Sequence, residues 1–130
     1  MHKRWFWYTG PFETENYVKN VQNRKVRSVI AKTRCDTLPI AIEIGRYRNI
    51  KKQDRLCVYC DKQEVEDRSH ILFTCALYED LRSQFLKNVE LKCNEPNEML
   101  VELLGKSDYL KQTGIYVSNI LSKRAGAVWI

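Results

Sequence analysis

The chain has 130 residues, of which 44% are hydrophobic and 29% charged; this length and composition predict one folded domain over residues 1–130 and exclude wholesale disorder. No apolar run reaches the roughly 20 residues that cross a bilayer, and the N-terminus lacks a secretory signal, so we expect an intracellular protein, nuclear or cytoplasmic, without a membrane partner. The net charge of +6 is uneven, because residues 1–56 hold 13 Lys and Arg against five Asp and Glu, and this asymmetry predicts an acidic partner such as nucleic acid.

The first predicted element is a helix over about residues 15–34, in a basic region (residues 14–56) that follows an aromatic N-terminal segment (residues 1–13). Thr14 can cap its start. Apolar residues recur at helical spacing: Tyr17, Val18, Val21, Val26, Val29 and Ile30. Its polar side carries five cations: Arg24, Lys25, Arg27, Lys32 and Arg34. A basic helix face of this kind can lie along a phosphate backbone.

Residues 35–45 interrupt the helical pattern, and we expect a loop or a short extended segment there. Pro39 disfavours a helical conformation at the residue before it. Isoleucines at positions 40, 42 and 44 alternate with other residues, as in a strand, and Gly45 permits a turn.

The next stretch is basic and contains an aromatic residue: Arg46, Tyr47, Arg48, Lys51, Lys52 and Arg55. A tyrosine between arginines can stack on a base while the cations hold its phosphate. We therefore predict a nucleic-acid-binding surface from these six residues together with Arg24, Lys25, Arg27 and Arg34 of the preceding helix. A tyrosine packed on a solvated basic surface would give the same sequence.

Three further helices are predicted. The first spans about residues 69–89, can be capped by Asp67 or Ser69, and has one apolar face: Phe73, Leu77, Leu81, Phe85 and Val89. The other two, in the C-terminal region 90–130, span about 96–104, between Pro96 and Gly105, and about 108–124, with Ser107 as the cap. The last helix carries an apolar stripe: Tyr109, Leu110, Tyr116, Val117, Ile120 and Leu121. The predicted fold class is mostly α, a small helical domain with room for a short hairpin at the first cysteine pair.

Residues 57–89 contain a metal-binding pattern, C-x2-C-x9-H-x4-C, formed by Cys57, Cys60, His70 and Cys75. A C-x2-C turn can bring two thiolates onto one metal ion, and four protein ligands close a tetrahedral sphere as structural zinc sites do. We therefore predict one structural Zn²⁺, because a catalytic zinc keeps one position open for water. The alternative is that His70 and Cys75 are merely packed on their helix. Cys35 and Cys93 lie outside the spacing and are expected to be buried or half-buried.

Other chemistries have weaker support. A redox C-x-x-C would need a βαβ context, and a cysteine–histidine nucleophile would need an oxyanion hole and an orienting third residue. The acidic run at residues 64–67 is expected to face the start of the helix after it. We therefore expect no enzyme activity.

The sequence contains the stretches TRCDTLPIAIEIGRYRNI, DRLCVYC, EVED, HILFTC and LYEDLR. Together they resemble the zinc-binding segment at the C-terminal end of reverse transcriptases from non-LTR (LINE-type) retrotransposons. The resemblance covers about residues 26–86. Its core is Gly45, Arg46, Tyr47, Arg55, Cys57, Cys60, Glu64, Glu66, Asp67, His70, Cys75, Tyr78 and Arg82. The sequence departs from the family at Arg68-Ser69, where an acidic and an aromatic residue are common, and at Ile71, where Phe is usual.

The resemblance implies that Cys57, Cys60, His70 and Cys75 are zinc ligands and that the module engages RNA or DNA. Members of that family carry an endonuclease and a polymerase domain ahead of this segment, and 130 residues leave no room for either. The alternatives are a zinc-stabilised protein–protein interaction module and an inactive truncated element copy. In the first, the aromatic residues Trp5 to Tyr8 would dock a protein instead of covering the core.

Overall fold

The computed structural model describes residues 24–105 and 108–128, and the regular structure there is almost entirely helical. The α-helices of this part are α2 (Arg24–Cys35), α3 (Ala41–Tyr47), α4 (Glu79–Lys87), α5 (Pro96–Leu104) and α6 (Leu110–Val128). Shorter turns lie between them: η1 (Lys52–Asp54), η2 (His70–Thr74) and η3 (Ala76–Tyr78). The predicted mostly α class is confirmed. The aromatic N-terminal segment and the proposed caps Thr14 and Ser107 lie outside the described residues.

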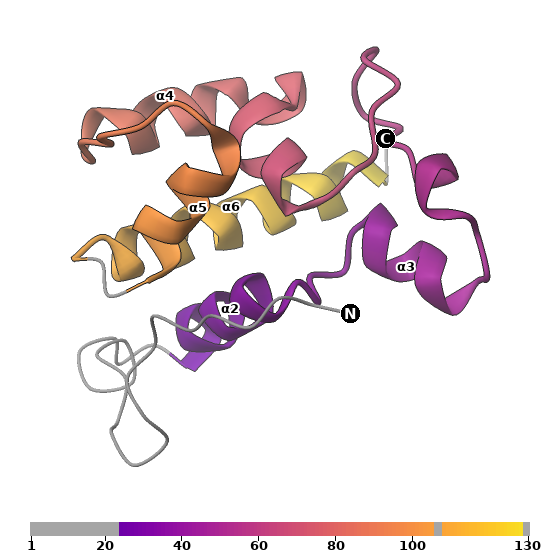
Figure 1. Cartoon of the computed structure of the whole chain (residues 1–130), viewed down its shortest axis with the longest axis horizontal. Helices are drawn as coiled ribbons and strands as arrows, with labels where there is room; N and C mark the ends of the chain where they lie inside the picture. Colours follow the sequence, from indigo (N-terminus) through magenta and orange to yellow (C-terminus); the bar gives the residue numbers. More distant parts are fainter. Residues whose placement is uncertain (1–23, 106–107, 129–130) are drawn as a thin grey trace.

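Helix α6 is the central element, and α2, α4 and α5 all pack against it (Figure 1). One side of α6 is buried in the main core through Tyr116, Val117 and Ile120, as the apolar stripe predicted. The ring of Tyr116 stacks on Phe85 of α4 with centroids 4.3 Å apart. Its hydroxyl donates a 2.6 Å hydrogen bond to the carbonyl oxygen of Leu72, which ties α6 to the segment that carries the predicted metal ligands.

Gly114 lets α2 approach α6 closely. A Cβ atom at this position would lie 2.6 Å from Cγ1 of Val26 and 2.8 Å from Cγ1 of Ile30. Both side chains are buried, and they form a second small core with Leu110. The contact between the two helices therefore depends on the absence of a side chain at residue 114.

The predicted loop at residues 35–45 is wrong in its second half, which forms α3. Pro39 constrains only the residue before it, so a helix can begin just afterwards. Ile40 and Ile42 are both buried, at the N-cap position and within the first turn. The first backbone N–H groups of the helix are satisfied from a distant residue: Ala41 donates to Oε1 of Glu66 at 2.7 Å, and Ile42 to the carbonyl oxygen of Glu66 at 3.1 Å. A local pattern cannot reveal such a cap.

The predicted continuous helix over 69–89 is interrupted at Cys75, whose φ of −65° and ψ of 129° are extended. Before the break the chain makes a wide π-type turn, in which the N–H of Cys75 donates to the carbonyl oxygen of His70 at 2.8 Å. Asp67 caps this turn as predicted, because its Oδ1 accepts the N–H of His70 at 2.8 Å. The predicted apolar face still meets the core: Phe85 and Val89 are buried in it, and Phe73, Leu77 and Leu81 are partly buried and pack against it.

Two predictions about α2 are also wrong. Arg34 is buried rather than on a basic face, and its Nε and Nη2 donate to the carbonyl oxygens of Leu104 and Gly105 at 2.6 and 3.0 Å. It thereby caps the C-terminus of α5, whose predicted ends at Pro96 and Gly105 are confirmed. Cys35, expected to be buried or half-buried, is exposed, whereas Cys93 is half-buried.

None of the helices in the described ranges combines the length and the apolar character that a bilayer crossing needs.

The close approach at Gly114 predicts the effect of a substitution there. Gly114→Val should lower the free energy of unfolding by about 2 kcal/mol, because added atoms in a packed core force neighbouring side chains and helices to shift. Gly126→Val is the matched control, since a Cβ at residue 126 of the same helix would meet nothing within 4 Å beyond its chain neighbours and the adjacent helix backbone. Urea denaturation of both variants tests this, and equal stabilities would contradict the packing account.

Candidate metal centre

The first half of the candidate metal centre is a tight hairpin that carries Cys57 and Cys60. The N–H of Cys57 donates to the carbonyl oxygen of Glu64 at 2.9 Å, and the N–H of Glu66 to that of Arg55 at 3.0 Å. One antiparallel bridge, Leu56 with Val65, joins its two sides. Inside the turn, the N–H of Tyr59 points at the sulfur of Cys57 at 3.4 Å. The short hairpin expected at the cysteine pair is therefore present.

The second half is the π-type turn that carries His70 and Cys75. Residues five apart on a regular α-helix point in different directions, whereas a wider turn places them nearly one above the other. Arg82 of α4 holds this turn, because its Nε donates to the carbonyl oxygen of Leu72 at 3.0 Å and its Nη2 to that of Cys75 at 2.9 Å. The break in the predicted helix is thus what allows both side chains to face the hairpin.

The four side chains meet at one point. Their ligand atoms all lie within 4.8 Å of one another: Sγ of Cys57, Cys60 and Cys75 and a ring nitrogen of His70. The sulfurs of Cys57 and Cys75 are 3.8 Å apart, and Nε2 of His70 is 3.4 Å from the sulfur of Cys60. Cys60 is half-buried and the other three are buried. Such a group can hold a metal ion.

Burial sets the protonation of the candidate ligands. It raises the pKa of the Cys57 thiol to about 12, with smaller contributions from the negative charge that Cys75 and Glu66 can carry. It also raises the pKa of Cys75 and lowers the pKa of His70, which favours the neutral imidazole. Without a cation the buried thiols keep their protons. A bound metal ion must displace them, because the thiolate is the ligand form.

Sequence reasoning missed a buried ion pair that joins the hairpin to α6. Glu66 is 1% exposed, and both oxygens of its carboxylate accept hydrogen bonds from Arg124, at 2.8 and 3.0 Å. The guanidinium of Arg124 also lies 5.1 Å from the centre of the Tyr59 ring, in the turn between the two cysteines. The sequence signals for Glu66 are the acidic run and its place in the core of the resemblance, and neither predicts a partner on α6.

Arg55 was predicted to bind nucleic acid, but its guanidinium makes contacts within the fold. Its Nη1 donates to the carbonyl oxygen of Ile42 and its Nε to that of Ile50, both at 2.9 Å. The side chain crosses Gly45, where a Cβ would lie only 2.5 Å from Cγ of Arg55. Arg55 therefore fastens α3 and the loop after it to the hairpin.

The other residues predicted to bind nucleic acid form two separate groups. Arg46, Tyr47, Arg48, Lys51 and Lys52 are exposed between the end of α3 and the start of η1. Arg24 and Lys25 are exposed and Arg27 is half-buried at the start of α2, at the end of that helix away from α3 (Figure 1). The ten predicted residues thus do not make one continuous surface.

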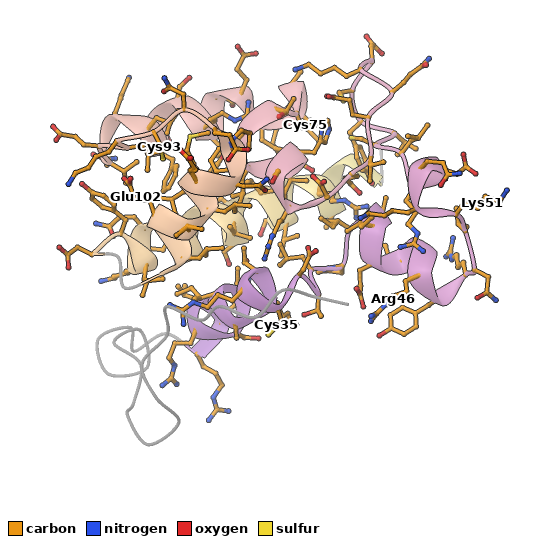
Figure 2. The ribbon with its side chains drawn as sticks, in the orientation of Figure 1. Cys35, Arg46, Lys51, Cys75, Cys93 and Glu102 are labelled. Atoms are coloured by element: carbon orange, nitrogen blue, oxygen red, sulfur yellow. The ribbon has the colours of Figure 1, made fainter. Side chains whose placement is uncertain are left out.

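The group at α3 and η1, which we call the α3 basic cluster (Arg46, Tyr47, Arg48, Lys51 and Lys52), combines charge with an aromatic ring. Tyr47 is 75% exposed. The guanidinium carbon of Arg46 lies 5.2 Å from the centre of its ring, and Nη2 of Arg46 donates to Oε1 of Glu43 at 2.6 Å. Arg46 and Lys51 project from the side of the molecule opposite Cys93 and Glu102 (Figure 2).

No family model, curated protein or solved structure matches this sequence. The resemblance to retrotransposon reverse transcriptases therefore stays a prediction, and the function is argued from the site.

The raised pKa values of the buried thiols predict proton release when a metal binds. Addition of one equivalent of Zn²⁺ to the metal-free protein at pH 7 in weak buffer should release at least two protons, one from each of the buried thiols Cys57 and Cys75. His70 should release none, because its lowered pKa leaves it neutral at this pH. A pH indicator dye or calorimetry in buffers of different ionisation enthalpy measures the number. Binding without proton release would exclude thiolate ligation.

Proposed function

We propose that the chain is a nucleic-acid-binding module, without catalytic chemistry of its own, that is held in shape by one structural zinc ion. The ligands of the ion are Cys57, Cys60, His70 and Cys75. The acidic partner is RNA or DNA, engaged mainly by the α3 basic cluster. One observation carries the proposal: Arg55 and Glu66, at the two ends of the hairpin that holds the first two ligands, form hydrogen bonds with α3, the helix from which this cluster begins.

The choice of zinc rests on the geometry and the donor set. A tetrahedron with metal–sulfur bonds of about 2.3 Å has sulfur–sulfur edges of about 3.8 Å, and one with a metal–nitrogen bond of about 2.0 Å has sulfur–nitrogen edges of about 3.5 Å. The observed 3.8 Å between Cys57 and Cys75 and 3.4 Å between Cys60 and His70 fit both edges. Thiolate and imidazole donors in a tetrahedron suit Zn²⁺ best among the common divalent ions. Four protein ligands leave no position for a reacting water, which supports a structural role.

The zinc site and the cluster are connected through few bonds. Glu66, at the end of the hairpin, caps the start of α3, while Arg55, at its beginning, holds the carbonyl oxygens of Ile42 and Ile50. The hairpin is only two short arms joined by one bridge, so its conformation needs the metal to be stable. Zinc would thereby fix the direction in which α3 and the following loop present their side chains.

The α3 basic cluster has the composition that a nucleic-acid strand requires. Four of its side chains are cations that can neutralise phosphates, and the exposed ring of Tyr47 can stack on a base. Arg46 is already directed along this ring by Glu43 and by its own contact with the phenol. Tyr47, the most exposed aromatic side chain in the described residues, therefore lies among cations with its ring open to a partner.

The zinc part of the proposal is tested by removing one ligand. Cys57→Ser should lose tight zinc binding and lower the thermal midpoint by more than 10 °C, since structural zinc contributes about 10–16 kcal/mol of apparent binding energy in small domains. Cys93→Ser is the matched control, because Cys93 lies outside the cluster. Zinc content and circular dichroism melts give the comparison. Equal melts for both variants would remove the structural role of the metal.

The nucleic-acid part is tested by salt dependence. Affinity for a 20-nucleotide RNA or DNA should fall steeply with salt, and the triple substitution of Arg48, Lys51 and Lys52 by Ala should reduce the slope of log K against log salt by about 2. The matched control substitutes Lys87, Lys92 and Lys111, which are exposed outside the α3 basic cluster, and leaves the net charge the same as in the first variant. Fluorescence anisotropy measures both. Equal losses in the two variants would show that binding follows net charge alone, and a wild type that binds neither nucleic acid would contradict the proposal.

A further inference from the structure

His70 has a second ring nitrogen that the metal site does not use. Its Nε2 faces the sulfur of Cys60 at 3.4 Å, whereas Nδ1 points the other way. The His70 side chain is 3% exposed, and Nδ1 is buried without a hydrogen bond in the structure. Oε1 of Glu64 lies 3.5 Å from Nδ1.

The chemistry of the imidazole requires an acceptor at this nitrogen. A neutral histidine that gives the lone pair of Nε2 to a metal ion carries its proton on Nδ1. A buried N–H group without a partner costs about 1–3 kcal/mol. Metal-binding histidines therefore usually donate this proton to a carboxylate, a carbonyl group or water, which fixes the orientation of the ring.

Among the neighbouring groups, Glu64 offers the carboxylate oxygen that the structure places within 4 Å of Nδ1. Asp67 already accepts the backbone N–H of His70 with its Oδ1, and the carbonyl oxygen of Thr74 accepts Nζ of Lys62. Beside the ring a cavity of about 260 Å³ is lined by Glu64, Val65, Asp67, Ser69, His70 and Thr74. The carboxylate of Glu64 is about half exposed, so it has room to move the few tenths of an ångström that a hydrogen bond needs.

The backbone of Glu64 is fixed by the other half of the site. Its carbonyl oxygen accepts the N–H of Cys57 at 2.9 Å. The preceding residue, Gln63, has a φ of 54°, a left-handed conformation that turns the chain back toward the cysteine pair. One residue thus contacts a ligand on the hairpin through its backbone and a ligand on the π-type turn through its side chain.

We propose that Glu64 is a positioning residue of the metal centre, whose carboxylate accepts the Nδ1 proton of His70 and holds Nε2 toward the ion. This inference rests on the zinc site of the proposed function. Glu64 itself is not a ligand. Its contribution is to keep the ring in one tautomer and one orientation, so that the ion is bound more tightly and leaves more slowly.

The test compares zinc affinities of full-length variants by competition with a chromophoric chelator at one fixed pH. Glu64→Ala should weaken zinc binding about 10- to 100-fold, and Glu64→Gln, which keeps an oxygen acceptor, should weaken it less. Asp61→Asn is the matched control, because Asp61 is an exposed carboxylate of the same loop. The change in zinc affinity of this variant reports the general effect of removing one negative charge near the site. In ¹H–¹⁵N NMR spectra of the zinc-loaded protein, the Nδ1–H signal of His70 should be visible in the wild type and lost by exchange in Glu64→Ala.

The outcomes separate this inference from the proposal on which it depends. If the wild type binds zinc tightly and Glu64→Ala weakens it no more than Asp61→Asn, with an unchanged Nδ1–H signal, the role of Glu64 is overturned while the zinc site stands. If the wild type binds no zinc, both are overturned. A loss in Glu64→Ala well beyond the control, together with the loss of the Nδ1–H signal, supports the inference.

Discussion

The convergence of three sulfur atoms and one imidazole nitrogen within 4.8 Å is the constraint around which the described chain is arranged. Burial raises the pKa of Cys57 and Cys75, so isolated thiolates are unfavourable in this group. A bound cation would stabilise the thiolates by neutralising their charge. The two elements that carry the ligands are short and irregular, a hairpin with one bridge and a single π-type turn. Neither is of a kind that is stable alone, and a shared ion would join them.

Two polar residues, Glu66, which is buried, and Arg82, which is half-buried, connect the ligand-bearing elements to the helical body. Glu66 links the hairpin to α3 through the N–H of Ala41 and to α6 through Arg124, while Arg82 links the π-type turn to α4. If one partner of an ion pair such as Glu66–Arg124 is removed, the other is left as an uncompensated charge away from water. The free energy of that unpaired charge opposes separation of the hairpin from α6. The exposed α3 basic cluster lies at the end of this path. Hydrogen bonds from Glu66 thus connect the candidate metal centre to the start of the helix that carries Arg46 and Tyr47.

The sequence allowed prediction of the features whose cause is local. The four candidate ligands, Cys57, Cys60, His70 and Cys75, lie within 19 consecutive residues. Pro96 marks the start of α5 and Gly105 marks its end. The features that were missed depend on distant partners. Helix α3 is capped by Glu66, 25 residues further on, and Arg34 donates to a carbonyl oxygen 70 residues away, whereas sequence reasoning assigns cations to the surface by default. The break at Cys75 was hidden because Phe73, Leu77, Leu81 and Phe85 keep helical spacing across it.

The most direct measurement is X-ray absorption at the zinc edge, on full-length protein purified without added metal or chelator and analysed for metal content. The account predicts one zinc per chain with three sulfur neighbours at about 2.3 Å and one nitrogen at about 2.0 Å. The Cys57→Ser variant should show no such centre. A folded wild-type protein without metal, or zinc surrounded by oxygen neighbours, would contradict the account and leave the four residues as ordinary packing in a helical domain.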